Sequence, residues 1–164
     1  MTDRASSSPD IPTEANISAA REVGDAALGQ WRHLRRGGEL DQWSKADQSL
    51  VCEVDIETDR RLKAILGAID PEAGWLSEET ADKPDRLACQ RIWCVDPIDG
   101  TRDFLRGREG WAVSIALIDA GLPVFGVLYA PARDELWLGA AGGGATLNGL
   151  PISATTKDVV GRTF

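Results

Sequence analysis

The sequence lacks several features that define large classes of protein. No stretch approaches the ~18 consecutive apolar residues that a membrane-spanning helix needs, and the N-terminus lacks the charged-then-apolar order of a secretory signal. The chain contains no GxxxxGKS loop and no GxGxxG motif. These absences argue against a membrane protein, a P-loop protein and a dinucleotide-binding protein.

Cysteine and histidine are also scarce. The three cysteines, Cys52, Cys89 and Cys94, have no CxxC spacing and are odd in number, which predicts a reduced, cytoplasmic protein. The single histidine, His33, lies among arginines in a predicted helix and is expected at the surface. No histidine-based catalytic triad is expected.

The net charge of the chain limits the classes of partner that it is expected to bind. A formal net charge of −8 over 164 residues argues against a basic surface that binds nucleic acid or an anionic membrane. It does not exclude a small phosphorylated substrate, because magnesium sites need clustered carboxylates and the bound ions reverse the local charge. The 43% apolar content suits one domain with a real core.

The hydrophobic pattern changes along the chain from helical to extended. Apolar residues at helical spacing predict helices over 12–36, ended by Gly37-Gly38, and over 55–69. A polar loop through Ser49 and a short extended segment, 50–52, are expected between them.

The second half of the sequence predicts strands. A short strand at 75–76 precedes an acidic turn, and the next strand, 91–95, is expected to close at Asp96 because Pro97 follows. Further strands are expected over 111–118, 122–130 and 134–140. Their short connections imply antiparallel neighbours. The predicted fold class is therefore α+β, with two N-terminal helices packed on a largely antiparallel sheet.

The segment Asp96-Pro97-Ile98-Asp99-Gly100-Thr101 carries the most chemical information. Two carboxylates leave the end of a strand on a Pro-Gly loop, and their convergence costs like-charge repulsion unless a cation lies between them. Gly100 allows close approach of a ligand to the backbone, and Thr101 can open a helical turn that faces a phosphate. By composition alone, a capped turn with two solvated aspartates is the competing interpretation.

Two other acidic segments could add to such a site. Ser77-Glu78-Glu79 follows the short 75–76 strand and offers a third carboxylate, although alone it is most often a solvated turn. Asp55 begins a predicted helix, where capping is its ordinary role. A calcium loop starting at Asp55 is excluded, because Arg60 replaces the required glycine and Leu66 the closing glutamate.

Taken in order, these segments resemble the inositol monophosphatase superfamily, and within it the bacterial 3′(2′),5′-bisphosphate nucleotidases of the CysQ type. The family pattern is V-T-x-x-D, then G/S-E-E, then D-P-[IL]-D-G-T with a phenylalanine three residues later. The corresponding pieces here are 51–55, 77–79 and 96–101 with Phe104. The resemblance extends from residue 12 to about 155.

The resemblance implies a set of metal ligands. It assigns Glu78, Asp96 and the Ile98 carbonyl to a first Mg²⁺, and Asp96 and Asp99 to a second, with Asp96 bridging. Two or three ions are implied for a complete site, together with inhibition by Li⁺. The implied fold is the N-terminal half of the αβαβα arrangement of the family.

The resemblance also implies catalytic roles. Thr101, supported by Asp55, would orient and help deprotonate the attacking water, and the N–H groups of Gly100 and Thr101 would hold the substrate phosphate. The implied reaction is Mg²⁺-dependent hydrolysis of a phosphomonoester. The expected substrate is 3′-phosphoadenosine 5′-phosphate, with inositol 1-phosphate as the alternative, and a homodimer is possible by family.

Three positions depart from the family pattern. Ser77 and Asp103 stand where inositol phosphatases typically have glycine and asparagine, which favours the nucleotidase branch. Cys52 replaces the usual threonine beside Asp55.

The family pattern also continues beyond this sequence. Members carry a W-D-x-A-A segment whose aspartate completes the second metal site, and no W-D pair occurs here. We therefore expect a disordered lead at 1–11, a metal-binding domain at 12–155, and the start of an absent α/β region at 156–164. A truncated, catalytically inactive family fragment, with sheet surface left uncovered, is the alternative from a different functional class.

Overall fold

The computed structural model describes residues 13–46 and 48–154. The predicted lead at 1–11 and the predicted start of a further region at 156–164 lie outside the described residues. The elements follow in this order: α1 (Thr13–Arg35), β1 (Gln42–Ser44), β2 (Leu50–Cys52), α2 (Glu53–Ile69), β3 (Gly74–Ser77), η1 (Pro84–Ala88), β4 (Arg91–Asp99), α3 (Thr101–Leu105), β5 (Ala112–Asp119), β6 (Leu122–Ala130), η2 (Pro131–Arg133), β7 (Glu135–Ala140), β8 (Gly144–Leu147) and β9 (Leu150–Ile152).

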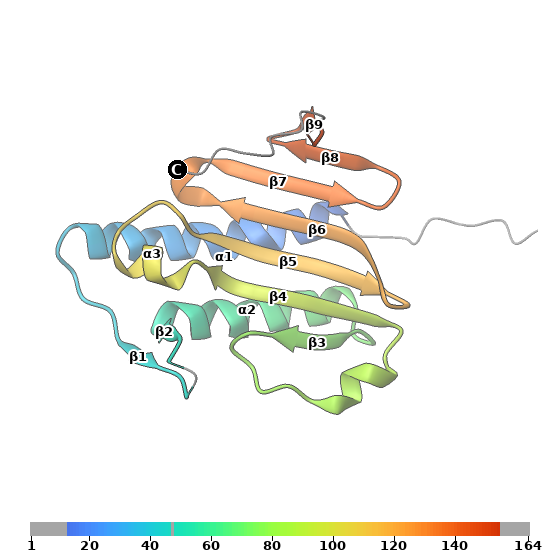
Figure 1. Cartoon of the computed structure of the whole chain (residues 1–164), viewed down its shortest axis with the longest axis horizontal. Helices are drawn as coiled ribbons and strands as arrows, with labels where there is room; N and C mark the ends of the chain where they lie inside the picture. The colour runs from blue at the N-terminus through green and yellow to red at the C-terminus, as the bar shows by residue number, and fades with distance from the viewer. Residues whose placement is uncertain (1–12, 47, 155–164) are drawn as a thin grey trace, which may run out of the picture.

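Strands β3 to β9 form one sheet in sequence order, and β1 and β2 form a separate small hairpin (Figure 1). Within the large sheet, β3 and β4 run parallel, whereas every following pair is antiparallel. This arrangement confirms the predicted α+β class with a largely antiparallel sheet.

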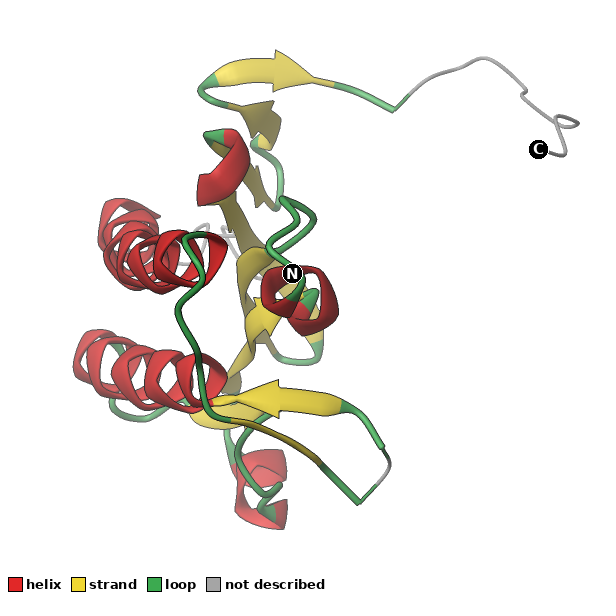
Figure 2. Ribbon diagram, turned by 90° about the vertical axis from the view of Figure 1, so that its left-hand side faces the viewer, coloured by secondary structure: helices red, strands yellow, loops and turns green. Residues whose placement is uncertain are grey.

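Both long helices, α1 and α2, pack on the same side of this sheet (Figure 2). Val113, Ile115 and Leu117 alternate along β5 and are all buried, as are Val23 of α1 and Leu62 of α2. The two-residue period of the strand and the helical period of α1 and α2 therefore meet in one core. Burying these faces against each other supplies the main stabilising free energy of the fold.

The prediction that Asp96 closes its strand is wrong, because β4 continues to Asp99. The pairing of β4 with β5 shifts between Asp96 and Asp99. Pro97 lies within this irregular stretch, where its missing N–H removes no regular ladder bond. The bulge therefore lets the strand pass through a proline and carry both aspartates to its carboxyl end.

One strand was missed by the sequence analysis. Residues 42–44 were assigned to a polar loop but form β1, which pairs with β2. Strand β1 is short and exposed, so it lacks the alternating apolar pattern that marks a strand facing the core.

The side of the sheet away from α1 and α2 is more open. Ser114, Leu128 and Trp137 are neighbours across three strands on this face, and all three are half-buried. With Ala116 and Gly126 they line a shallow hollow. The described part of the chain contains no helix long and apolar enough to cross a membrane.

Candidate metal and phosphate site

The carboxyl end of β4 delivers the candidate acidic residues to a tight turn. Asp96 is half-buried and Asp99 is exposed, and Gly100 follows with a φ of +92°. A Cβ on Gly100 would clash with the carbonyl oxygen of Gly110, so both the positive φ and the lack of space require glycine at this position. The turn leads directly into α3, which begins at Thr101.

Asp55 and Thr101, 46 residues apart in sequence, meet at this turn. The Thr101 hydroxyl lies 2.8 Å from Asp55 Oδ1 and 3.0 Å from the carbonyl oxygen of Ile98. The other Asp55 oxygen accepts hydrogen bonds from the backbone N–H of Cys52 at 2.8 Å and from its thiol at 2.9 Å. Asp55 is only 1% exposed. Its contacts therefore fix both the N-terminus of α2 and the orientation of the Thr101 hydroxyl.

Cys52 thus occupies the position where the family pattern has threonine and still donates to Asp55. Burial raises the pKa of the Cys52 thiol to about 12, and the neighbouring Asp55 adds to the effect. A thiol with this pKa stays protonated near neutral pH and remains a donor.

The candidate metal ligands crowd around Asp96. The pKa of Asp96 is raised to about 7, first by burial and then by the negative charges of Glu78 and Asp99. A hydrogen bond with Glu78 and the charge of Asp55 act in the same direction. These carboxylates are therefore close enough to repel one another, which is the electrostatic setting that a bound cation relieves.

The side-chain positions do not complete a coordination shell. Within 13–46 and 48–154, no three His, Cys, Asp or Glu side chains converge closely enough to hold an ion. Glu78 is half-exposed, with its carboxylate 3.6 Å from the Lys45 ammonium. The donors fit Mg²⁺ in chemical type, because it prefers hard carboxylate and carbonyl oxygens. A shared site would need a closer approach of at least three of these oxygen donors to one point.

Lys45 was not identified from the sequence. It lies just after β1, and its ammonium is 2.7 Å from Glu79 Oε1 and 3.2 Å from the carbonyl oxygen of Glu78. The Glu79 side chain is 4% exposed, so this ion pair is largely removed from water. The contact ties the β1–β2 hairpin to the acidic turn. No local pattern indicates it, because 34 residues separate the partners.

Asp59 was also missed. It is buried one helical turn after Asp55 on α2 and accepts hydrogen bonds from the hydroxyls of Ser77 and Thr80, the latter at 2.5 Å. The Ser77 hydroxyl in turn accepts from the backbone N–H of Glu79 at 3.2 Å. These bonds fasten the acidic turn to α2. The four-residue spacing of the two aspartates on one helix was the available signal.

The sequence pattern of the inositol monophosphatase family matches residues 10–162, which is most of the chain. The chain belongs to this family. The segments that carry the site, around Asp55, Glu78 and Asp96, all fall within the matched range.

Individual members of the inositol monophosphatase family support the same assignment. The 3′(2′),5′-bisphosphate nucleotidase CysQ of Escherichia coli K12 is 38% identical over 126 residues, which cover 75% of this chain and 49% of CysQ. The solved extragenic suppressor protein SuhB of Bartonella henselae is 29% identical, with a TM-score of 0.79 over 88% of this chain and 55% of that one. The Thermotoga maritima IMPase gives 28% identity and a TM-score of 0.77, over 88% of this chain and 54% of that one.

The chain spans about half the length of the curated relatives that it matches. The fold and the family are therefore shown for this chain. The roles of Asp55, Glu78, Asp96, Asp99 and the other site residues in binding and catalysis stay predictions.

Proposed function

We propose that this chain carries the metal-binding part of a Mg²⁺-dependent phosphomonoesterase. The observation that carries the proposal is the junction between β4 and α2. There the buried Asp55 fixes the Thr101 hydroxyl at 2.8 Å, beside an Asp96 whose pKa is raised to about 7 by burial and neighbouring carboxylates. A structural turn with solvated aspartates would show neither feature.

Different residues of the chain would bind the metal ions and the substrate phosphate. Glu78, Asp96 and the Ile98 carbonyl would hold one Mg²⁺, and Asp96 with Asp99 would hold another. Bound Mg²⁺ supplies charge neutralisation of the phosphate and acidifies the attacking water. The backbone N–H groups that open α3, at Gly100 and Thr101, would orient the substrate phosphate.

In this proposal, Thr101 would take part in proton transfer from the attacking water. Its hydroxyl has one hydrogen, and both Asp55 Oδ1 and the Ile98 carbonyl are within reach as acceptors. When the hydroxyl donates to Asp55, its lone pairs remain free to accept a proton from a water on the open side of the turn. Because Asp55 is buried and held by Cys52, the hydroxyl is oriented before substrate binds.

The proposed substrate is 3′-phosphoadenosine 5′-phosphate. The relative with 38% identity is named a 3′(2′),5′-bisphosphate nucleotidase, and Ser77 and Asp103 favour this branch. Inositol 1-phosphate is the second candidate, supported by the structural likeness to the Thermotoga IMPase.

The test measures phosphate release from both substrates, with and without Mg²⁺, and with added Li⁺. Asp96→Asn should abolish Mg²⁺-dependent release, while Glu72→Gln, which removes an exposed charge outside this cluster, should leave it unchanged. Activity that survived Asp96→Asn would refute the metal assignment. Magnesium binding without any release would support a non-catalytic, metal-binding chain instead.

A further inference from the structure

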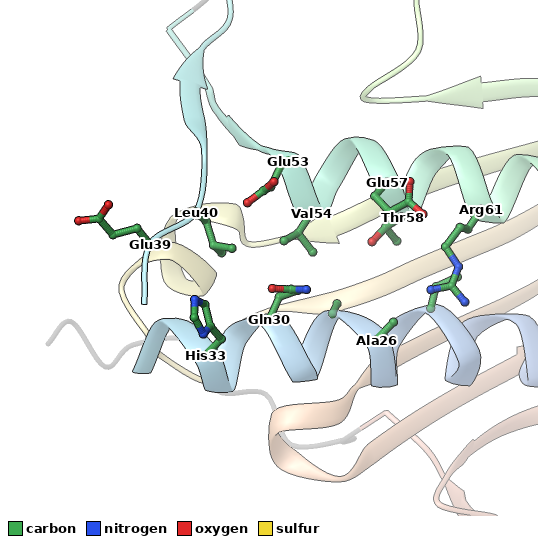
Figure 3. A pocket seen from close by; sticks show the side chains of 12 residues that line it. Ala26, Gln30, His33, Glu39, Leu40, Glu53, Val54, Glu57, Thr58 and Arg61 are labelled. Atoms are coloured by element: carbon green, nitrogen blue, oxygen red, sulfur yellow. The ribbon is translucent and has the colours of Figure 1, made fainter. Parts of the chain in front are cut away.

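A cavity of about 450 Å³ lies between α1 and α2, and neither Asp55 nor Thr101 lines it. Its volume falls within the range of about 300–1,000 Å³ that is typical of small-molecule sites. Figure 3 shows side chains of α1 on one side of it, side chains of α2 on the other, and Leu40 with Glu39 at one end.

The lining of the cavity combines apolar side chains with the hydroxyl-bearing side chain of Thr58. Val23, Ala27 and Val54 form part of the wall and are each at least nine-tenths buried. Thr58 is 4% exposed and lies on the side of α2 that faces α1 (Figure 3).

The charges around the cavity favour a cation. Arg61 is already paired with Glu22 at 2.7 Å, and Glu57 with Arg60 at 2.7 Å. Glu53 forms no ion pair within the described part of the chain, and only its Oε1 is engaged, by the backbone N–H of Asp41 at 3.3 Å.

The unpaired carboxylate lies at one end of the cavity. In Figure 3, the side chains of Glu53, Gln30 and His33 lie at that end of the cavity. The Glu39 side chain points away from the cavity and therefore adds less negative charge to it. A negative charge without a counter-ion next to an apolar wall is suited to an amphipathic cation.

We propose that this cavity binds a small organic cation with a short aliphatic body, such as an alkylguanidinium or alkylammonium group. The aliphatic part would lie along Val23, Ala27 and Val54. The cationic head would pair with Glu53 and donate to the amide oxygen of Gln30. The site is independent of the metal and phosphate site. It adjoins that site, however, because Glu53 and Val54 immediately precede Asp55 on α2.

The probe pair for the test is n-butylguanidinium and its neutral isostere n-butylurea. Isothermal titration at pH 8 should show one saturable site for butylguanidinium, with a Kd on the order of 1 mM for a ligand of this size. Butylurea should bind about fivefold more weakly, because it lacks the charge that pairs with Glu53. Equal affinities for the two probes, or no saturation at about tenfold above the expected Kd, would overturn the proposal.

Two variants test whether the probes bind in this cavity. Glu53→Gln should remove the preference for the cation, and Ala26→Phe should fill the cavity and abolish binding of both probes. The matched controls are Glu14→Gln and Ala15→Phe, exposed α1 positions outside the cavity, which should bind as the unmodified chain does. Circular dichroism verifies that each variant is folded. Retained binding in folded Ala26→Phe would show that the probe binds elsewhere, and the assignment would fail.

Discussion

Replacing Asp96 by asparagine should stabilise the chain without metal and remove its stabilisation by Mg²⁺. The pKa of Asp96 is raised to about 7 on folding, against about 3.9 in an unfolded chain. The folded state therefore binds a proton more tightly than the unfolded state. Ionisation of Asp96 therefore destabilises the folded state relative to the unfolded state. This destabilisation is absent below about pH 4, grows as the pH rises, and is complete above about pH 7.

The size of this destabilisation follows from the difference between the folded-state and unfolded-state pKa values of Asp96. Each pKa unit corresponds to about 1.4 kcal/mol, so the full difference would be about 4 kcal/mol. Because Asp96 is only half-buried, solvent screens its interactions with Glu78 and Asp99, and we expect about 1–2 kcal/mol at pH 7.5. Asparagine keeps the shape of the side chain and removes the charge.

The assay is urea unfolding followed by circular dichroism at pH 5.0 and 7.5, in EDTA and in excess Mg²⁺. In EDTA the variant should be the more stable protein at pH 7.5, with a smaller advantage at pH 5.0. In Mg²⁺ only the unmodified chain should gain stability, because binding to the folded state alone shifts the equilibrium. Glu72→Gln removes an equal charge from an exposed site and should change stability by less than about 0.5 kcal/mol. If Asp96→Asn destabilised the chain in EDTA, the account of crowded carboxylates would be refuted.

Two further predictions concern packing and thiol reactivity. A Cβ on Gly24 would approach Cδ1 of the Tyr129 ring to 2.5 Å. Gly24→Ala should therefore lower the free energy of unfolding, measured in urea, by about 1–2 kcal/mol, although alanine has the better helix propensity. Gly29→Ala, on the same helix with nothing within 4 Å, should gain up to about 1 kcal/mol, and equal responses of the two variants would contradict the packing argument. Cys52 is fully buried with a pKa of about 12, so it should react with a thiol reagent at pH 8 only after unfolding, while the other two cysteines react in the native state. Rapid modification of Cys52 in the folded chain would show that α2 opens locally.

Much of the local structure could be predicted because it depends on short spacings. The helical repeat of apolar residues from Ile17 to Trp31 and the alternation in 111–118 each report one buried face. The observed α1 and β5 agree with these predictions to within one residue at each end. The tight turn at Gly100 could be predicted for a similar reason, since only glycine fits its backbone without strain.

By itself, the sequence determined the helices, most of the strands, the family, and the acidic segments that could form one site. Only the tertiary structure decided that β3 runs parallel to β4, that β4 continues through Pro97, and that Lys45 and Asp59 fasten the acidic turn. The physical reason is the distance along the sequence between the residues that interact. A periodic pattern records which face of an element is buried, but not which distant element covers it. Hydrogen bonds between residues 18 to 46 positions apart exist only after the layers have packed.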